Sequence, residues 1–218
     1  MGYSIAIDGP AGAGKSTIAR LVAKEKGFIY VDTGAMYRGL AVHFLKKGIR
    51  PEDTEKIKEA CRDAQVSIGY EEGQQQVYLN GENITPLLRS EEVGSMASKS
   101  SAVPEVREKL LSLQREMARS QNVVMDGRDI GTCVLPDADV KVYLTASSRT
   151  RAKRRYDELT SRGVPCDLEQ IERDIIERDS RDMNRETAPL RQAEDAVLVD
   201  SSDMTIRQVA DTIHGLCR

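Results

Sequence analysis

Short apolar runs alternate with amphipathic stretches of helical length along most of the chain. Residues 3–8 form a largely apolar run that ends in glycine, and residues 15–26 then repeat apolar side chains at helical spacing. A second apolar run at 28–31 leads into another amphipathic stretch that ends at Gly48. This order of strand, helix, strand and helix predicts a parallel sheet with helices on both faces.

The second half of the chain continues this pattern after one interruption. Three further apolar runs, separated by segments of helical length, lie at residues 123–125, 140–144 and 196–199. We therefore expect five strands in one core sheet. Between residues 64 and 90, apolar and polar positions alternate and Gly-containing pairs follow at 72–73 and 80–81, which predicts an antiparallel insertion.

Composition narrows the class of protein. The 218 residues include 32 basic and 35 acidic side chains, and the formal net charge of -3 argues against bulk nucleic-acid binding. Four scattered cysteines and two histidines form no metal-ligand pattern, so we expect reduced thiols. Because no apolar run approaches the roughly 18 residues of a membrane span and the N-terminus lacks leader features, we expect one cytoplasmic domain over residues 1–218.

A complete phosphate-binding motif joins the first predicted strand to the first predicted helix. Its residues are Gly9, Pro10, Ala11, Gly12, Ala13, Gly14, Lys15 and Ser16, followed by Thr17. The glycines let the backbone curl so that its N–H groups face phosphate oxygens, and the helix N-terminus adds to the attraction. We expect Lys15 to lie along the β- and γ-phosphates of a bound nucleotide and Ser16 to ligate Mg²⁺.

The loop alone does not define the reaction, because switch GTPases, motor ATPases and transporters also use it. The guanine-specific N-K-x-D motif is absent, and the chain is small for a mechanical ATPase. Phosphoryl transfer to a small molecule is therefore the favoured interpretation. A regulatory nucleotide switch without a second substrate is the alternative from another class.

Charged residues follow the apolar run at 123–125, where ligands bind in open α/β sheets. We expect Asp126 to hold Mg²⁺ through water, Arg128 to meet a phosphate and Asp129 to accept a hydrogen bond. A polar turn after a strand is the alternative interpretation. These residues predict a second pocket beside the phosphate loop.

Two cation-rich segments lie further along. Arg178, Arg181, Asp182 and Arg185 have the spacing that gathers side chains on one face of a helix. Taken alone, such a helix is typical of a solvated face with i,i+4 ion pairs, but three like charges on one face repel unless an anion such as phosphate joins them. Five cations within residues 149–155 predict a lid that excludes water and neutralises charge. A nucleic-acid-binding helix is the alternative, but few aromatic side chains accompany these cations.

Four segments together resemble the bacterial cytidylate kinases, a family of nucleoside monophosphate kinases, over nearly the whole chain. These segments are residues 7–16, 32–38, 126–132 and 177–185. The resemblance implies a three-layer α/β P-loop kinase with a monophosphate-binding insertion at about 62–95 and a helical lid at about 150–166. It also implies transfer of the γ-phosphoryl group of MgATP to CMP or dCMP in pyrimidine nucleotide metabolism.

The resemblance assigns residues to the site. The implied catalytic residues are Lys15, Arg128, Arg178 and Arg181. The implied ATP-binding residues are those of the loop at 9–17 with Arg154. The implied CMP-binding residues are Thr33, Tyr37, Arg38, Ser98, Arg107, Arg128, Asp129, Arg178, Asp182 and Arg185. The implied metal ligands are Ser16 and Asp126, and Thr33 departs from several relatives that carry serine there.

The chemistry of cytosine agrees with this assignment. Its N4 amino group donates a hydrogen bond that a carboxylate such as Asp129 accepts, whereas uracil presents an oxygen there. Arg107 and Ser98 can donate to the O2 and N3 acceptors of the base. Kinases of UMP, AMP or shikimate remain the nearest alternatives. We expect a monomer whose partners are small molecules, without nucleic acid or membrane.

Overall fold

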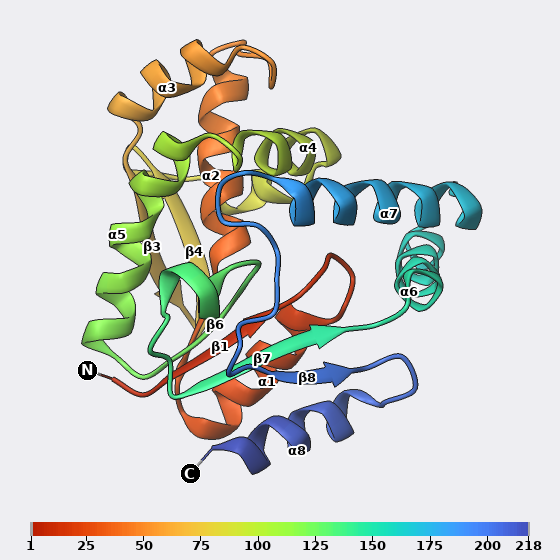
Figure 1. The fold of residues 1–218 in the computed structure, drawn as a ribbon. Coiled ribbons are helices and arrows are strands. Elements are labelled where there is room, and N and C mark those ends of the chain that lie inside the picture. The colour runs from red at the N-terminus through yellow and green to blue at the C-terminus, as the bar shows by residue number, and fades with distance from the viewer. Residues whose placement is uncertain (1, 218) are drawn as a thin grey trace.

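A five-stranded sheet forms the centre of the computed structural model, which describes residues 2–217 (Figure 1). Its strands are β1 (Ser4–Asp8), β2 (Ile29–Asp32), β6 (Val123–Gly127), β7 (Val140–Thr145) and β8 (Val197–Asp200). All neighbouring strands are parallel, in the order β2-β6-β1-β7-β8. The predicted five-stranded parallel sheet is therefore confirmed.

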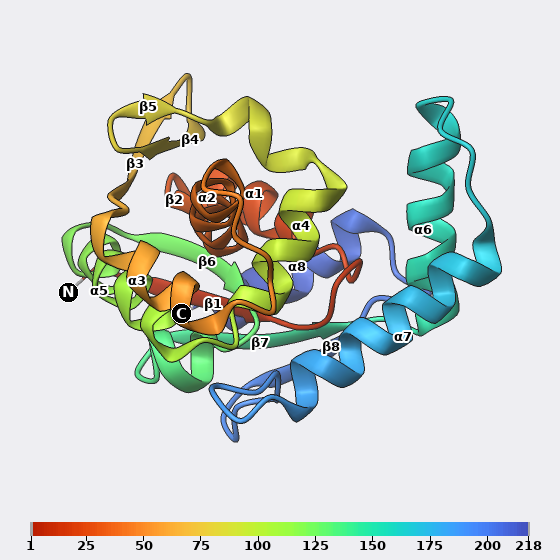
Figure 2. The ribbon, with the colours of Figure 1, turned by 90° about the horizontal axis from the view of Figure 1, so that it is seen from above.

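Helices cover both faces of this sheet (Figures 1 and 2). They are α1 (Lys15–Lys26) and α8 (Ile206–Leu216) on one face, and α2 (Thr33–Lys46) and α5 (Pro104–Ser120) on the other. Ile5 and Ile7 of β1 pack in the cluster that contains α1 and α8, whereas Ala6 packs in the cluster that contains α2 and α5. Because successive strand side chains point to opposite faces, burial on both faces requires the apolar run seen in the sequence.

The predicted antiparallel insertion is also confirmed. It contains β3 (Val66–Glu71), β4 (Gln74–Leu79) and β5 (Glu82–Asn83), flanked by α3 (Thr54–Asp63), the short 3₁₀ helix η1 (Thr85–Arg89) and α4 (Glu91–Ser100). Both connections are two-residue turns in which each residue has positive φ, 51° and 74° at 72–73 and 51° and 85° at 80–81. That geometry matches the twist of the flanking strands, so the turn pairs fix the register.

Two further helices follow strand β7 along the chain. They are α6 (Ser148–Ser161) and α7 (Leu168–Asn184), and in Figure 2 α6 stands out to one side of the molecule and meets α7. The prediction that one helix carries all of residues 178–185 is wrong at its last member, because α7 ends before Arg185. The chain reverses there: the Leu190 N–H donates to the Asp182 carbonyl at 2.8 Å, and Arg185 adopts an extended conformation.

Candidate active site

The predicted phosphate loop adopts a conformation that requires its glycines. Gly9, Gly12 and Gly14 have φ values of 147°, 77° and 91°, in the region that glycine favours. A Cβ atom on Gly9 would lie 1.9 Å from the carbonyl oxygen of Leu144 in β7. Lys15 begins α1, and its ammonium group donates to the Pro10 carbonyl at 2.8 Å. The loop thus folds around a buried lysine at the carboxyl end of β1.

A cleft of about 280 Å³ opens beside this loop, where the carboxyl ends of β2 and β6 meet α2, α4, α5 and α7. Most of the sequence-predicted site residues line it. They are Ala11, Gly12, Lys15, Ser16, Thr33, Tyr37, Arg38, Ser98, Arg107, Asp126, Arg128, Asp129, Arg178, Asp182 and Arg185. The structure thus brings residues from five separate segments to one cavity.

Asp126 lies at the end of β6 with both carboxylate oxygens engaged. The Ser16 hydroxyl donates to Oδ2 at 2.9 Å and the Tyr30 hydroxyl donates to Oδ1 at 3.0 Å. Burial raises the pKa of Asp126 to about 6, and the nearby charge of Asp32 acts in the same direction. Lys15 already lies near this carboxylate, and a further cation beside it would favour its charged form. Tyr30 belongs to no recognisable motif, so its contact with Asp126 was not predicted from the sequence.

Asp129 follows two residues after β6 and lies between two arginines. Arg107 from α5 donates to Oδ2, and Arg185 approaches Oδ1 at 3.5 Å. Only 6% of the Asp129 side chain is exposed, so these are buried charges. The Arg107 guanidinium also lies 5.7 Å from the centre of the Tyr37 ring. The carboxylate accepts hydrogen bonds and the two arginines donate them, so together they can recognise a heterocyclic ring that carries both donors and acceptors.

The middle of the cleft carries an excess of positive charge. Arg128 pairs with Asp182 at 2.9 Å. The Nε atom of Arg178 is buried and has no hydrogen-bond partner among residues 2–217. Burial, followed by the charge of Arg128, lowers the pKa of Lys15 to about 7 and that of Arg178 to about 10. Because each of these cations is destabilised by burial and by its cationic neighbour, an anion bound between them would relieve both effects.

Two of the predicted arginines lie outside the cleft, and so do Gly9, Pro10, Ala13, Gly14 and Thr17 of the predicted ATP-binding loop. Arg154 of α6 donates to the Ser201 carbonyl at 2.7 Å, at the end of β8. Arg181 is exposed on α7 and lies 3.7 Å from Glu177. The cation of α6 that contacts the phosphate loop is instead Arg151, which is buried and donates to the Ala11 carbonyl at 2.9 Å.

Asp32 is a residue of the cleft to which the sequence analysis gave no role. Its Oδ1 accepts the Ala35 N–H at 2.8 Å and so caps α2, while its Oδ2 accepts Arg38 at 3.0 Å. From the insertion, the amide of Gln75 bonds to both the N–H and the carbonyl of Asp32, at 2.9 and 3.1 Å. An aspartate between a strand and a helix is a typical N-cap, which is the signal that could have identified it.

A larger hollow of about 850 Å³ lies between α3 and α5. Lysine and glutamate side chains line it, and they pair with one another, as Lys58 does with Glu55 at 3.0 Å and Glu105 at 3.8 Å. These pairs neutralise its charge, so the smaller cleft holds the chemically active groups.

Among residues 2–217, no helix combines the length and apolarity that crossing a membrane requires.

Comparisons with known proteins agree on one family. The family model described as cytidylate kinase matches residues 5–218. A cytidylate kinase of Caldicellulosiruptor bescii is 48% identical over 213 residues, 98% of this chain and 94% of that protein. A cytidylate kinase of Streptococcus pneumoniae is 47% identical over 212 residues, 97% and 95% of the two chains.

A comparison of folds gives a more distant likeness. An uncharacterized protein from Eubacterium ventriosum, 13% identical in sequence, has a TM-score of 0.52 and covers 98% of this chain and 96% of its own. At that identity the likeness concerns the fold alone.

Proposed function

The chain belongs to the cytidylate kinase family and transfers the γ-phosphoryl group of ATP to CMP or dCMP, and we propose that the 280 Å³ cleft carries out this reaction. One observation carries the proposal. The phosphate loop with Lys15 and the buried carboxylate of Asp129 line the same cavity, together with Arg178, whose buried Nε has no hydrogen-bond partner among residues 2–217. A donor and an acceptor nucleotide can therefore meet there with their phosphates facing each other.

The loop at 9–17 forms the ATP side of the proposed site. Lys15 would lie along the β- and γ-phosphates, where its positive charge, destabilised by burial, gains anionic partners. The hydroxyl of Ser16 and the carboxylate of Asp126, 2.9 Å apart, are oxygen ligands that suit Mg²⁺. Among residues 2–217, no group of three or more carboxylate, histidine or cysteine side chains could hold a metal, so nucleotide phosphates and water would complete the coordination. Bound there, Mg²⁺ would neutralise charge on the phosphates.

The arginines of the middle region form the acceptor-phosphate site. Arg38, Arg128 and Arg178 line the cleft, and within the described part of the chain the buried Nε of Arg178 has no acceptor. A monophosphate bound between them would take up that donor and reduce the mutual repulsion of the guanidinium groups. No covalent intermediate is needed, because the second pKa of a phosphate ester near ~6 leaves an anionic nucleophile at neutral pH.

Asp129, Arg107 and Ser98 form the proposed base site. The carboxylate would accept the N4 amino group of cytosine, and the other two side chains would donate to O2 and N3. Uracil would place an oxygen against Asp129 and leave buried groups unpaired. Asp182 and Arg185 lie next to this site and would contact the sugar or phosphate, while Thr33 and Tyr37 form its wall.

Arg154 and Arg181 remain predictions for a closed state. Neither lines the cleft as it stands, so both require α6 and α7 to move toward the loop when the two nucleotides are bound. Such closure would exclude water and add positive charge around the transferred group. A lid at about 150–166, an insertion at about 62–95, a single domain, a monomeric state and a cytoplasmic location belong to the same proposal.

An assay of ADP release with CMP, dCMP, UMP and AMP tests the function. We expect release with CMP and dCMP, and absence of release with every acceptor would favour a nucleotide switch. Asp129→Asn should reduce the preference for CMP over UMP by at least about tenfold, the effect of about 1.4 kcal/mol. The matched control is Asp137→Asn, at an exposed aspartate of the same connection, which should leave the preference unchanged. An unaltered preference in Asp129→Asn would show that this carboxylate does not read the base.

A further inference from the structure

The residues that follow Asp129 form a rare backbone element. They make up the π-helical turn η2 (Ile130–Val134), in which the Val134 N–H donates to the Asp129 carbonyl at 3.2 Å and the Leu135 N–H donates to the Ile130 carbonyl at 2.7 Å. π-turns of this kind occur mostly at functional sites. Because the Asp129 carbonyl closes the turn, the conformation of η2 and the position of Asp129 are linked.

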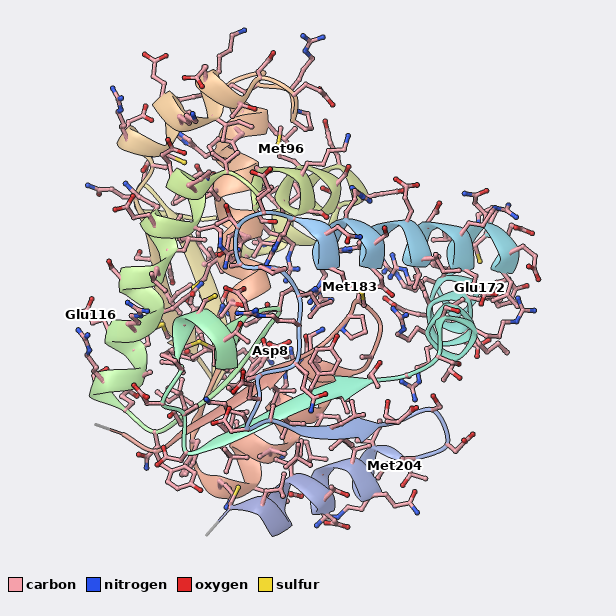
Figure 3. All side chains as sticks on the ribbon, in the orientation of Figure 1. Asp8, Met96, Glu116, Glu172, Met183 and Met204 are labelled. Carbon is pink, nitrogen blue, oxygen red and sulfur yellow. The ribbon has the colours of Figure 1, made fainter. Side chains whose placement is uncertain are left out.

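A buried carboxylate holds the first end of η2. Asp8, labelled near the centre of the molecule in Figure 3, accepts the Ile130 N–H at 2.8 Å and the Gly131 N–H at 2.7 Å. Asp8 is 5% exposed and is the last residue of β1. The N–H groups at the start of a helical turn have no partner within the turn and favour a nearby anion, so the contact with Asp8 is stabilising.

A cation holds the other end of η2. Arg115 of α5 donates through Nε to the Val134 carbonyl at 3.0 Å and through Nη2 to the Cys133 carbonyl at 2.9 Å. Carbonyl groups at the end of a helical turn favour a cation. The same helix supplies Arg107, which pairs directly with Asp129. Helix α5 therefore holds Asp129 twice, once through its carboxylate and once through the turn behind it.

The packing of η2 leaves little room for adjustment within the turn. A Cβ atom placed on Gly131 would lie 3.2 Å from the side chain of Lys141 and 3.5 Å from the carboxylate of Asp8. Close-packed interiors transmit a local shift to their neighbours. Loosening of η2 at Val134 is therefore expected to move Asp129.

We propose that Arg115 is a positioning residue for recognition of the base: by fixing the last carbonyls of η2 opposite the Asp8 contact, it sets where the carboxylate of Asp129 lies. This inference rests on the proposed function, in which Asp129 accepts the amino group of cytosine. Arg115 is not among the residues that line the cleft, so it would act on the nucleotide through other residues, and its side-chain hydrogen bonds go to η2.

The test compares Arg115→Met with Arg119→Met, which removes the same side chain at an exposed position one turn further along α5. In Arg115→Met we expect kcat/KM for CMP to fall about tenfold, mainly through KM, as expected for loss of charge-assisted hydrogen bonds. We expect the CMP to UMP preference to fall at least about fivefold, because UMP gains nothing from Asp129. KM for ATP should stay within about twofold, and Arg119→Met should behave like the unmodified protein.

Arg115→Lys keeps the positive charge but cannot donate to both carbonyls in the way the guanidinium does. Its CMP to UMP preference should therefore lie between those of the unmodified protein and Arg115→Met. If Arg115→Met does not fold, Arg115→Lys decides the question alone, and an unchanged preference there overturns the proposal. A merely structural role would lower thermal stability and leave the preference and the KM for CMP unchanged. The reference variant is Asp129→Asn. A loss of preference there without any loss in Arg115→Met or Arg115→Lys refutes positioning by Arg115, whereas no loss in Asp129→Asn refutes the base reader itself.

Discussion

Replacement of Arg107 by methionine tests the charge balance of the base site. Arg107 and Asp129 form a buried ion pair, with 11% and 6% of their side chains exposed. Arg185 lies 3.5 Å from the other oxygen of Asp129 and remains after the replacement. Methionine retains much of the apolar stem, so Arg107→Met removes chiefly the charge and its hydrogen bonds.

The expected loss of stability follows from that geometry. Removing one partner of a buried ion pair costs about 3–5 kcal/mol, because the other charge is left buried. Arg185 still compensates part of the charge of Asp129, so we expect about 2–3 kcal/mol. For a chain of this size, each kcal/mol lowers Tm by about 2–4 °C, which gives a decrease of roughly 4–12 °C. Arg119→Met, at an exposed position of the same helix, should change stability by no more than about 0.5 kcal/mol.

Urea unfolding of the two single variants and the double variant measures the coupling. Asp129→Asn alone leaves Arg107 and Arg185 as adjacent buried cations, so it is also destabilising. In Arg107→Met with Asp129→Asn both members of the pair are uncharged, and of the three groups only Arg185 keeps its charge. The double variant should therefore be about 2 kcal/mol more stable than the sum of the single effects predicts. Additivity within about 0.5 kcal/mol would refute the idea that these two side chains balance each other.

Two further replacements test the loop and the insertion. Lys15→Ala should abolish turnover, because Lys15 is the buried cation of the phosphate loop, while calorimetry should still detect CMP binding; unchanged turnover would contradict the assignment. Gln75→Ala removes both hydrogen bonds to the main chain of Asp32, so KM for CMP should rise about threefold without an equal change in KM for ATP. Gln76→Ala, on the same strand, loses only a 3.4 Å contact with Asn83 and is the control; equal effects in the two variants would indicate a general weakening of the insertion.

Local patterns predicted much of this fold because each depends on nearby residues. The apolar runs identified the five strands. β1 and β6 are buried along their whole length, and a strand buried on both faces has no polar alternation, whereas the edge strand β8 exposes Val197 and Leu198. Glycine-containing turn pairs located the antiparallel insertion, since each requires positive φ. The phosphate loop was recognisable for the same reason, with glycines at positions that strain other residues.

Contacts between distant segments were not predictable in this way. The π-turn η2 depends on Asp8, 122 residues before Ile130, and on Arg115 from another helix. Helical spacing placed Arg185 on the face of a helix, but the backbone bond between Leu190 and Asp182 turns the chain at that point. Neither interaction has a local signature, because each joins atoms that only the complete fold brings together.

The sequence by itself therefore determined the strands, the turns, the phosphate loop and, through four segments taken together, the family. The tertiary structure decided which charges neutralise one another: Arg128 pairs with Asp182, Arg107 pairs with Asp129, and Arg178 keeps a buried donor that no atom of residues 2–217 accepts. The physical reason is the different distance along the chain over which each effect acts. Backbone preferences act over a few residues, whereas burial and ion pairing depend on distances across the whole chain.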